Sequence, residues 1–186
     1  MTDNLKFPIY SIGHGNRSVE TFFELLKKYE IDFLIDVRTN PFSRFNPNFS
    51  RGNIENICKD HMVTYVFMGD GLGGKPKYRS CYDKQGYVIY ERVMETERFI
   101  HSINRLITAY NKNLRVVCMC SELKPCECHR SKMIGRYLDR QNINVQHIDE
   151  KGNLLSQTQV INQISNGYGE VDLFGYLAGA TSVGVY

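Results

Sequence analysis

The segment from residue 116 to residue 131 carries the richest chemistry of this chain. It reads VVCMCSELKPCECHRS and contains four of the six cysteines. Cys120 is expected at the end of a buried strand, where it would face the start of the next helix and Arg130. Positive potential of this kind favours a thiolate, and a helix start with an arginine is also a ready binding site for an anion. The segment therefore predicts a nucleophile, Cys120, with a lowered thiol pKa beside an anion pocket.

The same four cysteines could instead bind a metal ion. They form two Cys-x-Cys pairs, and His129 directly follows the second pair. Thiolate and imidazole groups are ligands of zinc and of iron–sulfur centres. Each pair, however, has one intervening residue where zinc sites commonly have two or more, and Cys118 falls inside a predicted core strand. We therefore expect no metal and no other cofactor, and we expect Cys118, like Cys58 and Cys81, to be an inert core residue.

A second reactive segment follows the strand predicted at residues 31–37. It contains Asp36, Arg38 and Arg44. Arginine suits bidentate binding of an anion, and an aspartate can hold a guanidinium in place or relay a proton. The alternative is a structural salt bridge at a strand end.

A histidine, His14, lies between two glycines after another predicted strand. Glycines allow the backbone to approach a ligand closely. The alternative is an ordinary exposed histidine in a loop.

Short apolar runs alternate with amphipathic segments along the chain. Strands are predicted at 7–12, 31–37, 64–68, 114–120 and 144–148, and helices at 18–29, 90–110 and 129–141. Parallel neighbours need long crossovers, so this alternation predicts an α/β fold with a mostly parallel sheet of about five strands between two helical layers. Ligands bind such sheets at the carboxyl ends of the strands. His14, Arg38 and Cys120 each follow a predicted strand, so we expect them to converge.

The glycine-rich segment 69–74 precedes Lys75, Lys77 and Arg79, which interleave with tyrosines. No complete phosphate-binding glycine fingerprint is present, so we interpret this region as a flexible basic lid. Tyrosines between cations suit bases stacked beside a phosphate backbone. An ordinary surface that contains tyrosines would have the same composition.

The composition is typical of a globular protein. With 186 residues, 42% hydrophobic and 23% charged, the chain fits a single domain over residues 1–186. Lys and Arg number 23 against 20 Asp and Glu, and the resulting charge of +3 does not by itself indicate nucleic-acid binding. No secretory signal starts the chain, and its longest uncharged stretch, 173–186, is shorter than the roughly 20 residues of a membrane span. We expect a cytoplasmic protein with reduced cysteines and no membrane contact.

Several short motifs follow one another in a specific order. They are Ser11-Ile12-Gly13-His14, Asp36-Val37-Arg38, Pro41-x-Ser43-Arg44, Leu72-Gly73-Gly74, Cys120-x-Glu122 and Cys128-His129-Arg130. This set resembles the domain of unknown function 488 family over about residues 10–147, and it leaves the residues from about 155 as a C-terminal extension. The resemblance implies a site with Cys120 and Cys128 rather than Cys118 and Cys126, which argues against a four-cysteine metal centre. It implies no particular reaction, because the activity of the family is not established.

A second resemblance is to rhodanese-like domains. In these domains an Asp-Val-Arg strand end precedes a later strand that ends in the catalytic cysteine, whose loop runs into Arg-Ser at a helix start. Asp36-Val37-Arg38, Cys120 and Arg130-Ser131 follow that order. Nine residues separate Cys120 from Arg130, a longer loop than the tight anion loop of rhodaneses. The resemblance implies a shared layout, and the longer loop argues against persulfide transfer.

We therefore predict an enzyme, a cysteine-dependent transferase or hydrolase, that acts on a phosphate-bearing nucleotide or nucleic acid. Cys120 would be the nucleophile, and Glu122, His14 and Asp36 would transfer protons. The other site residues, which would bind the substrate and its anion, are Arg38, Ser43, Arg44, Gly73, Gly74, Cys128, His129 and Arg130. Two alternatives remain open: a non-catalytic nucleic-acid-binding or adaptor domain that reads phosphates with the same arginines, and a small zinc or iron–sulfur protein.

Overall fold

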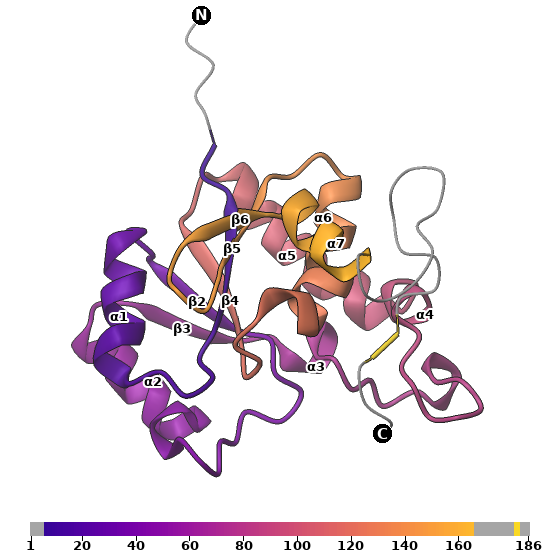
Figure 1. Ribbon diagram of the computed structural model, residues 1–186, viewed down its shortest axis with the longest axis horizontal. Coiled ribbons are helices and arrows are strands. Elements are labelled where there is room, and N and C mark those ends of the chain that lie inside the picture. Colours follow the sequence, from indigo (N-terminus) through magenta and orange to yellow (C-terminus); the bar gives the residue numbers. More distant parts are fainter. Residues whose placement is uncertain (1–5, 166–180, 183–186) are drawn as a thin grey trace, which may run out of the picture.

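The computed structural model describes residues 6–165 and 181–182, whose centre is a six-stranded sheet with helices on both faces (Figure 1). The strands are β1 (Ile9–Gly13), β2 (Phe33–Asp36), β3 (Thr64–Phe67), β4 (Val116–Cys120), β5 (Val145–Ile148) and β6 (Leu154–Ser156). Their order in the sheet is β3-β2-β4-β1-β5-β6. The first five strands in this order are parallel to their neighbours, and β6 is antiparallel to β5. The predicted α/β fold is confirmed, with β6 as one strand more than expected.

Seven α-helices surround this sheet among the described residues. They are α1 (Val19–Lys28), α2 (Arg51–Asp60), α3 (Gly69–Leu72), α4 (Tyr90–Met94), α5 (Glu97–Asn111), α6 (Arg136–Arg140) and α7 (Gln157–Ser165). Shorter 3₁₀ turns lie at Pro47–Phe49, Arg79–Cys81 and Pro125–Glu127, and a π-helical turn at Arg130–Gly135 precedes α6. No helix in the described part of the chain has the length and apolar character needed to cross a membrane.

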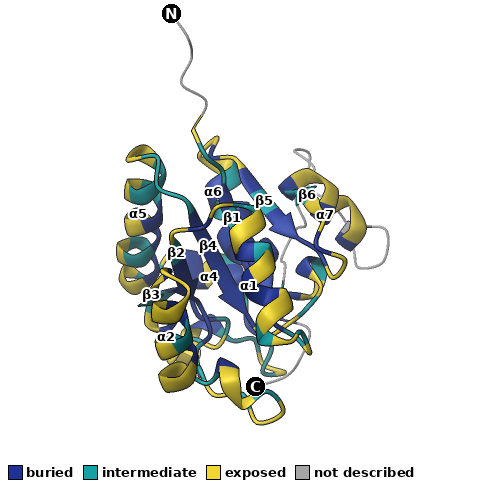
Figure 2. Cartoon of the chain, turned by 90° about the vertical axis from the view of Figure 1, so that its left-hand side faces the viewer, coloured by how far each residue is buried: buried dark blue, intermediate teal, exposed yellow. Residues whose placement is uncertain are grey.

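The strands divide the core into two layers because successive side chains point to opposite faces. On β4, Val116, Cys118 and Cys120 belong to the apolar cluster that includes residues of α5, α6 and α7. Val117 and Met119 belong to the other cluster, with residues of α1 and α2. Figure 1 shows these two groups of helices on opposite sides of the sheet, and Figure 2 shows the strands buried between them.

The expected core cysteines are in the core. Cys58 and Cys81 are 0% exposed and Cys118 is 1% exposed. Burial raises the pKa of both Cys58 and Cys118 to about 12, so these two remain protonated at neutral pH. All six cysteines are free thiols.

Three expected elements differ from the structure. The single helix predicted at 90–110 is two helices, because the Thr96 side chain donates to Val93 O and accepts from Phe99 N, which ends α4 and caps α5. The helix predicted at 129–141 begins with a π-helical turn. The segment 69–74, expected to be a loop, forms α3 over its first four residues.

The helix α2 and the elements after residue 153 were not predicted. Only Ile54 and Cys58 of α2 are buried, so its apolar pattern is weak. Of the C-terminal extension, β6 and α7 are described, and residues 166–180 and 183–186 lie outside the described part, as does most of the stretch 173–186.

The chain leaves β1 and β2 toward the layer of α1 and α2, whereas it leaves β4 toward the opposite layer. Loops that depart in opposite directions from adjacent parallel strands open a crevice at their carboxyl ends. Gly13 of β1 is paired with Cys120 of β4 at this point. A Cβ atom on Gly13 would lie 1.9 Å from the Glu122 carbonyl oxygen, so only glycine allows the two loops to pass this closely.

Candidate functional site

A pocket of about 360 Å³ opens at the carboxyl end of β4. Cys120, Glu122 and His129 line it together with two cationic residues, Arg38 and Lys75. These residues come from the ends of β2 and β4, from the segment after α3 and from the residue before the π-helical turn. Sulfur, carboxylate, imidazole and cationic groups therefore meet in one place.

Three side chains that line this pocket, those of Cys120, Glu122 and His129, form a tight cluster with Cys128 behind them. The Cys120 thiol donates to Glu122 Oε2 at 2.7 Å, and Cys128 Sγ lies 3.2 Å from the same oxygen. His129 Nδ1 lies 3.7 Å from Cys120 Sγ and 3.6 Å from Cys128 Sγ. Cys120, Cys128 and His129 are buried, whereas Glu122 is exposed. We call these four residues the sulfur cluster.

The loop after β4 folds back to build this cluster. Pro125 starts a 3₁₀ turn, and the backbone N–H of Cys128 donates to the Pro125 carbonyl at 3.1 Å. The Ser131 hydroxyl bonds to the carbonyls of Pro125 and Cys128, at 2.6 and 3.1 Å. These bonds return Cys128 to within reach of Cys120.

The two sulfurs of the cluster differ in their pKa values. Burial raises the pKa of both thiols, but at Cys128 the hydrogen bond with Cys120 and the positive charges of Arg130 and His129 outweigh burial and hold the pKa well below its usual range. At Cys120, burial together with the hydrogen bond and the charge of Cys128 raises the pKa well above its usual range. The expected lowering of the Cys120 pKa is therefore wrong, because burial and the neighbouring Cys128 and Glu122 outweigh the charge of Arg130, which donates to Cys128 instead.

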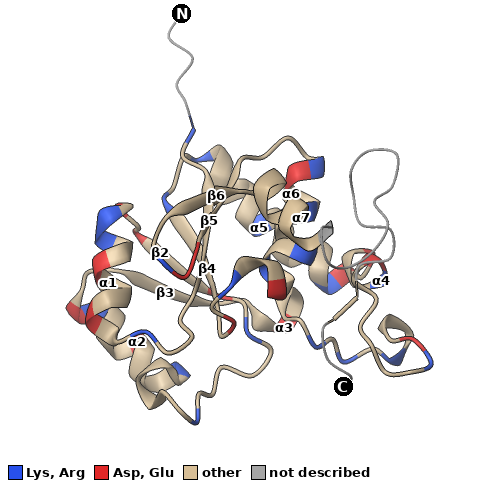
Figure 3. Cartoon of the chain, viewed as in Figure 1, with Lys and Arg blue, Asp and Glu red and all other residues tan. Residues whose placement is uncertain are grey.

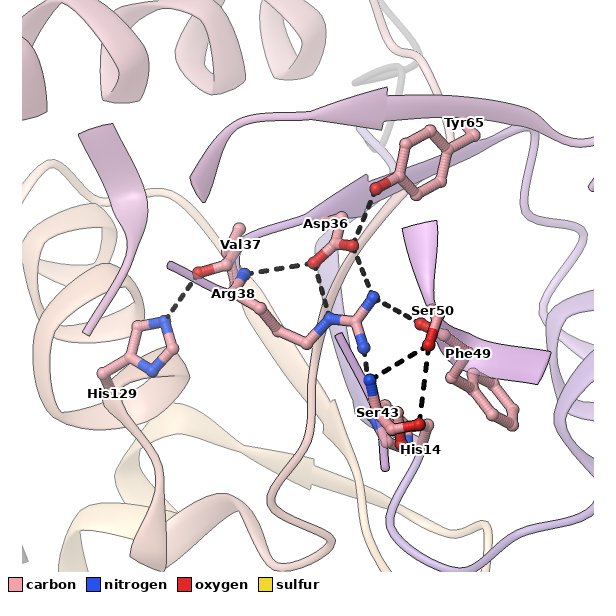
Figure 4. Close-up of polar contacts among 9 residues, drawn as sticks. All are labelled: His14, Asp36, Val37, Arg38, Ser43, Phe49, Ser50, Tyr65 and His129. Atoms are coloured by element: carbon pink, nitrogen blue, oxygen red, sulfur yellow. Dashed lines mark hydrogen bonds and ion pairs between the residues drawn. The ribbon is translucent and has the colours of Figure 1, made fainter. Parts of the chain in front are cut away.

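The other two groups of the cluster also have shifted pKa values. Glu122 is exposed as a residue, but its carboxylate is turned toward the buried sulfurs; partial removal of that carboxylate from water, together with the negative charge of Cys128, raises the pKa of Glu122. Burial would lower the pKa of His129, but the charge of Cys128 and the hydrogen bond to it raise that pKa overall. On its other side, His129 Nε2 donates to the Val37 carbonyl at 3.1 Å, which fixes the ring (Figure 4).

Arg130 lies beneath the pocket rather than in its lining. Its side chain is 1% exposed. Its Nε and backbone N–H donate to Cys128 Sγ at 3.2 and 3.4 Å, and its Nη2 donates to the Glu122 carbonyl at 2.7 Å. This position favours stabilisation of the Cys128 thiolate over direct contact with a substrate in the pocket.

A buried hydrogen-bond chain holds Arg130 from the far side. Its Nη1 donates to Ser11 Oγ at 3.2 Å, and Ser11 Oγ lies 2.6 Å from His147 Nδ1. His147 Nε2 lies 2.6 Å from Gln157 Oε1, and Gln157 Nε2 donates to the Ser131 carbonyl at 3.0 Å. Because Gln157 Oε1 can only accept, His147 Nε2 carries the proton and its Nδ1 accepts from the Ser11 hydroxyl. Neither His147 nor Gln157 was predicted from the sequence as a site residue.

Arg38 is fixed by an ion pair with Asp36 at the end of β2 (Figure 4). Its Nε and Nη2 donate to the two carboxylate oxygens at 2.9 and 2.6 Å, and Nη2 also donates to the Phe49 carbonyl at 2.7 Å. The Tyr65 hydroxyl adds a bond to Asp36 Oδ2 at 2.7 Å. Asp36 is 0% exposed, so it holds Arg38 in place and does not line the pocket.

His14 is a buried neighbour of Arg38. Its ring stacks on Phe49 with centroids 4.5 Å apart, and its Nδ1 donates to the Gly15 carbonyl at 3.1 Å. Its Nε2 therefore accepts from Arg38 Nη1 at 3.3 Å. Burial, aided by the charge of Arg38, lowers the pKa of His14 to about 4, so this ring is neutral at pH 7.

Of the expected binding residues, Arg38, Gly74 and His129 line the pocket, whereas Ser43, Arg44, Gly73, Cys128 and Arg130 do not. The Ser43 backbone N–H donates to Ser50 Oγ at 3.1 Å. The Arg44 guanidinium lies over the ring of Phe45, 5.8 Å from its centroid, in an exposed loop.

Gly73 and Gly74 contact the site through their backbone. A Cβ on Gly73 would lie 2.3 Å from Thr39 Oγ1, and a Cβ on Gly74 would lie 2.9 Å from His129 Nδ1. Both glycines therefore allow close approach of the chain to groups at the pocket.

The basic segment after α3 continues away from the pocket. Lys77, Arg79 and Lys84 are exposed, as is Tyr78. Figure 3 shows the Lys and Arg positions of this segment along the loop between α3 and α4. Cations thus extend from the pocket edge over the adjoining surface.

The arrangement of the sulfur cluster permits two kinds of chemistry, nucleophilic attack by a sulfur and the binding of a metal ion. Cys120 and Glu122 can exchange a proton, which would let the sulfur act as a nucleophile. The four donor atoms also lie within 4.8 Å of one another, close enough for one metal ion to contact them all. The cluster omits Cys118 and Cys126, so within the described residues it is no four-cysteine centre.

Fold and site together define a parallel α/β protein with a sulfur-rich site at the carboxyl end of a central strand. The model of the family described as "Domain of unknown function DUF488" matches residues 18–138, more than half of the chain. The chain belongs to this family. No curated protein and no solved structure matches the chain. The matched residues include the sulfur cluster and Arg38, whereas His14, His147 and Gln157 lie outside them.

Proposed function

We propose that this protein is an enzyme, a cysteine-dependent transferase or hydrolase, that acts on a phosphate-bearing nucleotide or nucleic acid. One observation carries the proposal: Cys120, Glu122 and His129 line the same pocket as Arg38 and Lys75. A thiol within reach of a base is the arrangement of a nucleophilic site, and adjacent cations suit an anionic substrate. Free thiols throughout the chain fit a reducing compartment, which for this protein we take to be the cytoplasm.

The anion would bind between Arg38 and Lys75. Four of the five N–H groups of Arg38 bond to Asp36, Phe49 and His14, and these bonds orient the remaining Nη1 hydrogen. Lys75 is exposed at the pocket edge. Lys77 and Arg79 continue this positive surface, which favours a substrate with more than one phosphate.

The reaction would use Cys120 and Glu122. The thiol proton of Cys120 passes to Glu122 Oε2, 2.7 Å away, as the sulfur forms a bond to the electrophilic atom of the substrate. Glu122 then returns the proton to the leaving group as the bond to that group breaks. Water or a second acceptor, which gives its proton to Glu122, would next take the substrate group from the sulfur, and that proton would restore the Cys120 thiol. The raised pKa of Glu122 makes its carboxylate a stronger base, which favours acceptance of the thiol proton.

A protection experiment tests the shared pocket, with inorganic phosphate as the probe. Iodoacetamide labelling of Cys120 is followed by mass spectrometry with and without phosphate. We expect phosphate to slow labelling of Cys120 in the wild type and to have less effect in Lys75→Ala, because the phosphate would lie beside the sulfur. Lys84→Ala is the matched control, since Lys84 is an exposed lysine of the same segment outside the pocket lining.

The outcome separates the proposal from its alternatives. Protection that is lost in Lys75→Ala but kept in Lys84→Ala supports an anion site at Cys120. A labelling rate that phosphate leaves unchanged in the wild type overturns the proposal. If phosphate raises the melting temperature of the protein but does not slow the labelling of Cys120, the protein is a phosphate-binding domain whose anion site is separate from the sulfur.

A further inference from the structure

We propose that the sulfur cluster binds one divalent transition-metal ion, zinc by its donor set, through Cys120, Cys128, His129 and Glu122. The ion would be the cofactor of the enzyme proposed above, so its catalytic use rests on that proposal, whereas its binding does not. The site differs from the four-cysteine centre that the sequence suggests, because it takes one cysteine from each Cys-x-Cys pair.

The distances within the cluster fit a tetrahedral ion. Zinc–sulfur bonds of about 2.3 Å and zinc–nitrogen bonds of about 2.0 Å at a tetrahedral angle place sulfur and nitrogen about 3.5 Å apart. The two observed distances from His129 Nδ1 to the sulfurs are 3.7 and 3.6 Å. The ring nitrogen therefore already lies at ligand spacing from both sulfurs.

Glu122 would complete the coordination on the pocket side. Its Oε2 lies 2.7 and 3.2 Å from the sulfurs, somewhat closer than the roughly 3.5 Å of a tetrahedral edge. Glu122 is exposed, so its carboxylate can move outward by the small amount needed. Its place beside the pocket makes it the ligand that a substrate could displace.

The surroundings of His129 are those of a metal-binding histidine. Its Nε2 donates to the Val37 carbonyl, so Nδ1 faces the sulfurs, and a metal ion that binds there would displace any proton on Nδ1 and take its lone pair. Gly74 packs against this ring, because even a Cβ at this residue would lie 2.9 Å from Nδ1. The ring is thus oriented from two sides toward one point.

The charges of the site also suit a divalent cation. Two thiolates and one carboxylate carry three negative charges, which a divalent ion and the buried Arg130 would balance. Arg130 donates two N–H bonds to Cys128 Sγ, and outer hydrogen bonds of this kind support metal-bound ligands. Sulfur and imidazole donors favour zinc over magnesium or calcium, which prefer oxygen.

The ion would change how Cys120 reacts. A metal ion keeps a coordinated thiol deprotonated, so the bound ion would take over from Glu122 as the group that removes the Cys120 proton. The proton would leave to solvent when the metal binds.

The test is titration of the full chain with Zn²⁺ and with Co²⁺ after treatment with a chelator. We expect one equivalent to bind, and bound Co²⁺ to show the intense visible absorption of a tetrahedral site with thiolate ligands. Cys128→Ser and His129→Gln should lower zinc affinity by more than about 100-fold, beyond the typical effect of losing an outer hydrogen bond. Cys126→Ser is the matched control, because Cys126 lies outside the cluster, and it should bind like the wild type.

Circular dichroism of each variant distinguishes the loss of a metal ligand from the loss of folding. Glu122→Gln is a second ligand variant, and because Glu122 is exposed, this substitution leaves the core packing unchanged. The inference is overturned if the folded wild type takes up no zinc. It is also overturned if Cys128→Ser binds zinc as tightly as Cys126→Ser does. The phosphate-protection experiment, run on metal-free protein, is independent of this result. If phosphate protects Cys120 but the protein takes up no zinc, only the proposed metal site is excluded. If the protein takes up zinc but phosphate does not protect Cys120, only the proposed substrate is excluded.

Discussion

Gly74 packs so closely against His129 that no side chain fits between them: a Cβ would stand 2.9 Å from Nδ1 and 3.0 Å from Cγ of the ring. The φ angle of Gly74 is not in the left-handed region, so the conformation itself does not demand glycine. The requirement is space at the sulfur cluster. This contact explains why the segment after α3 carries a glycine where it meets the site.

Gly74→Ala should therefore disturb the metal site more than the fold. We expect the added methyl to displace the ring and to lower zinc affinity by about tenfold or more, as changes around metal ligands do. Gly52→Ala is the control, because a Cβ there meets nothing within 4 Å in α2. It should leave zinc affinity unchanged and raise stability by about 0.5 kcal/mol. Zinc titration and urea unfolding measure the two quantities, and equal zinc affinities would contradict the prediction.

Removal of Arg38 should be far costlier than removal of one of its neighbours. Arg38→Met leaves the fully buried Asp36 carboxylate without its cation and should destabilise the protein by about 3–5 kcal/mol. Tyr65→Phe removes one bond to the same carboxylate and should cost about 1 kcal/mol. Urea unfolding at pH 7 gives both values.

The double variant Asp36→Asn with Arg38→Met supplies the control for this ion pair. It removes the buried charge together with its partner, so it should be more stable than Arg38→Met alone. A double variant as unstable as the single one would show that the arginine contributes through packing and not through charge.

Much of the fold could be predicted from local patterns. Ser18 caps α1 as expected, with its side chain accepting from Thr21 N, because a cap depends only on neighbours in the sequence. The position of Cys120 at the pocket follows from strand alternation and from the rule for parallel sheets. The break at Thr96 was missed although a threonine before a helix is a start signal, since the apolar spacing continues across it.

The detailed site depended on contacts that no local pattern contains. Ser11 and His147 are paired in register on β1 and β5, but the sequence does not reveal which strands are neighbours. The return of Cys128 to Cys120 depends on the turn at Pro125 and on Ser131. The lowered pKa was therefore expected at the cysteine on the strand end, whereas Arg130 reaches the other sulfur.

The two side-chain hydrogen bonds of Gln157, to His147 and to the Ser131 carbonyl, should stabilise the packing of α7 against the π-helical turn. Gln157→Leu removes the acceptor of His147 and the donor to the Ser131 carbonyl, and it leaves both groups buried without these bonds. We expect a loss of about 1–3 kcal/mol in the free energy of unfolding. Faster hydrogen exchange in the π-helical turn should accompany it, because this turn loses its bond to α7.

Gln163→Leu is the control for this change, since Gln163 is an exposed glutamine of the same helix. It should leave both stability and exchange near the wild-type values. Exchange in the turn that is equal in the two variants would show that α7 does not hold it.

His147 should make the protein less stable in mild acid. Burial lowers the pKa of His147 to about 4 from its ordinary 6.5, and the groups that face the ring are Ser11 from β1, Gln157 from α7 and the charges of Arg130 and Cys128. Between these two pH values the unfolded chain binds a proton that the folded chain does not. The free energy of unfolding therefore falls as the pH drops from 6.5 toward 4, by about 2 kcal/mol at pH 5 from this histidine.

The variant His147→Gln isolates this contribution, because glutamine does not titrate. We expect it to be less stable than the wild type at pH 7, since it cannot reproduce both ring hydrogen bonds in the same place. Its stability should then fall less steeply between pH 7 and pH 5, with the two curves converging by about 2 kcal/mol. His101→Gln, at an exposed position of α5, should keep the wild-type slope. Urea unfolding at several pH values measures the slopes, and parallel curves for wild type and His147→Gln would show that His147 takes up its proton equally in both states.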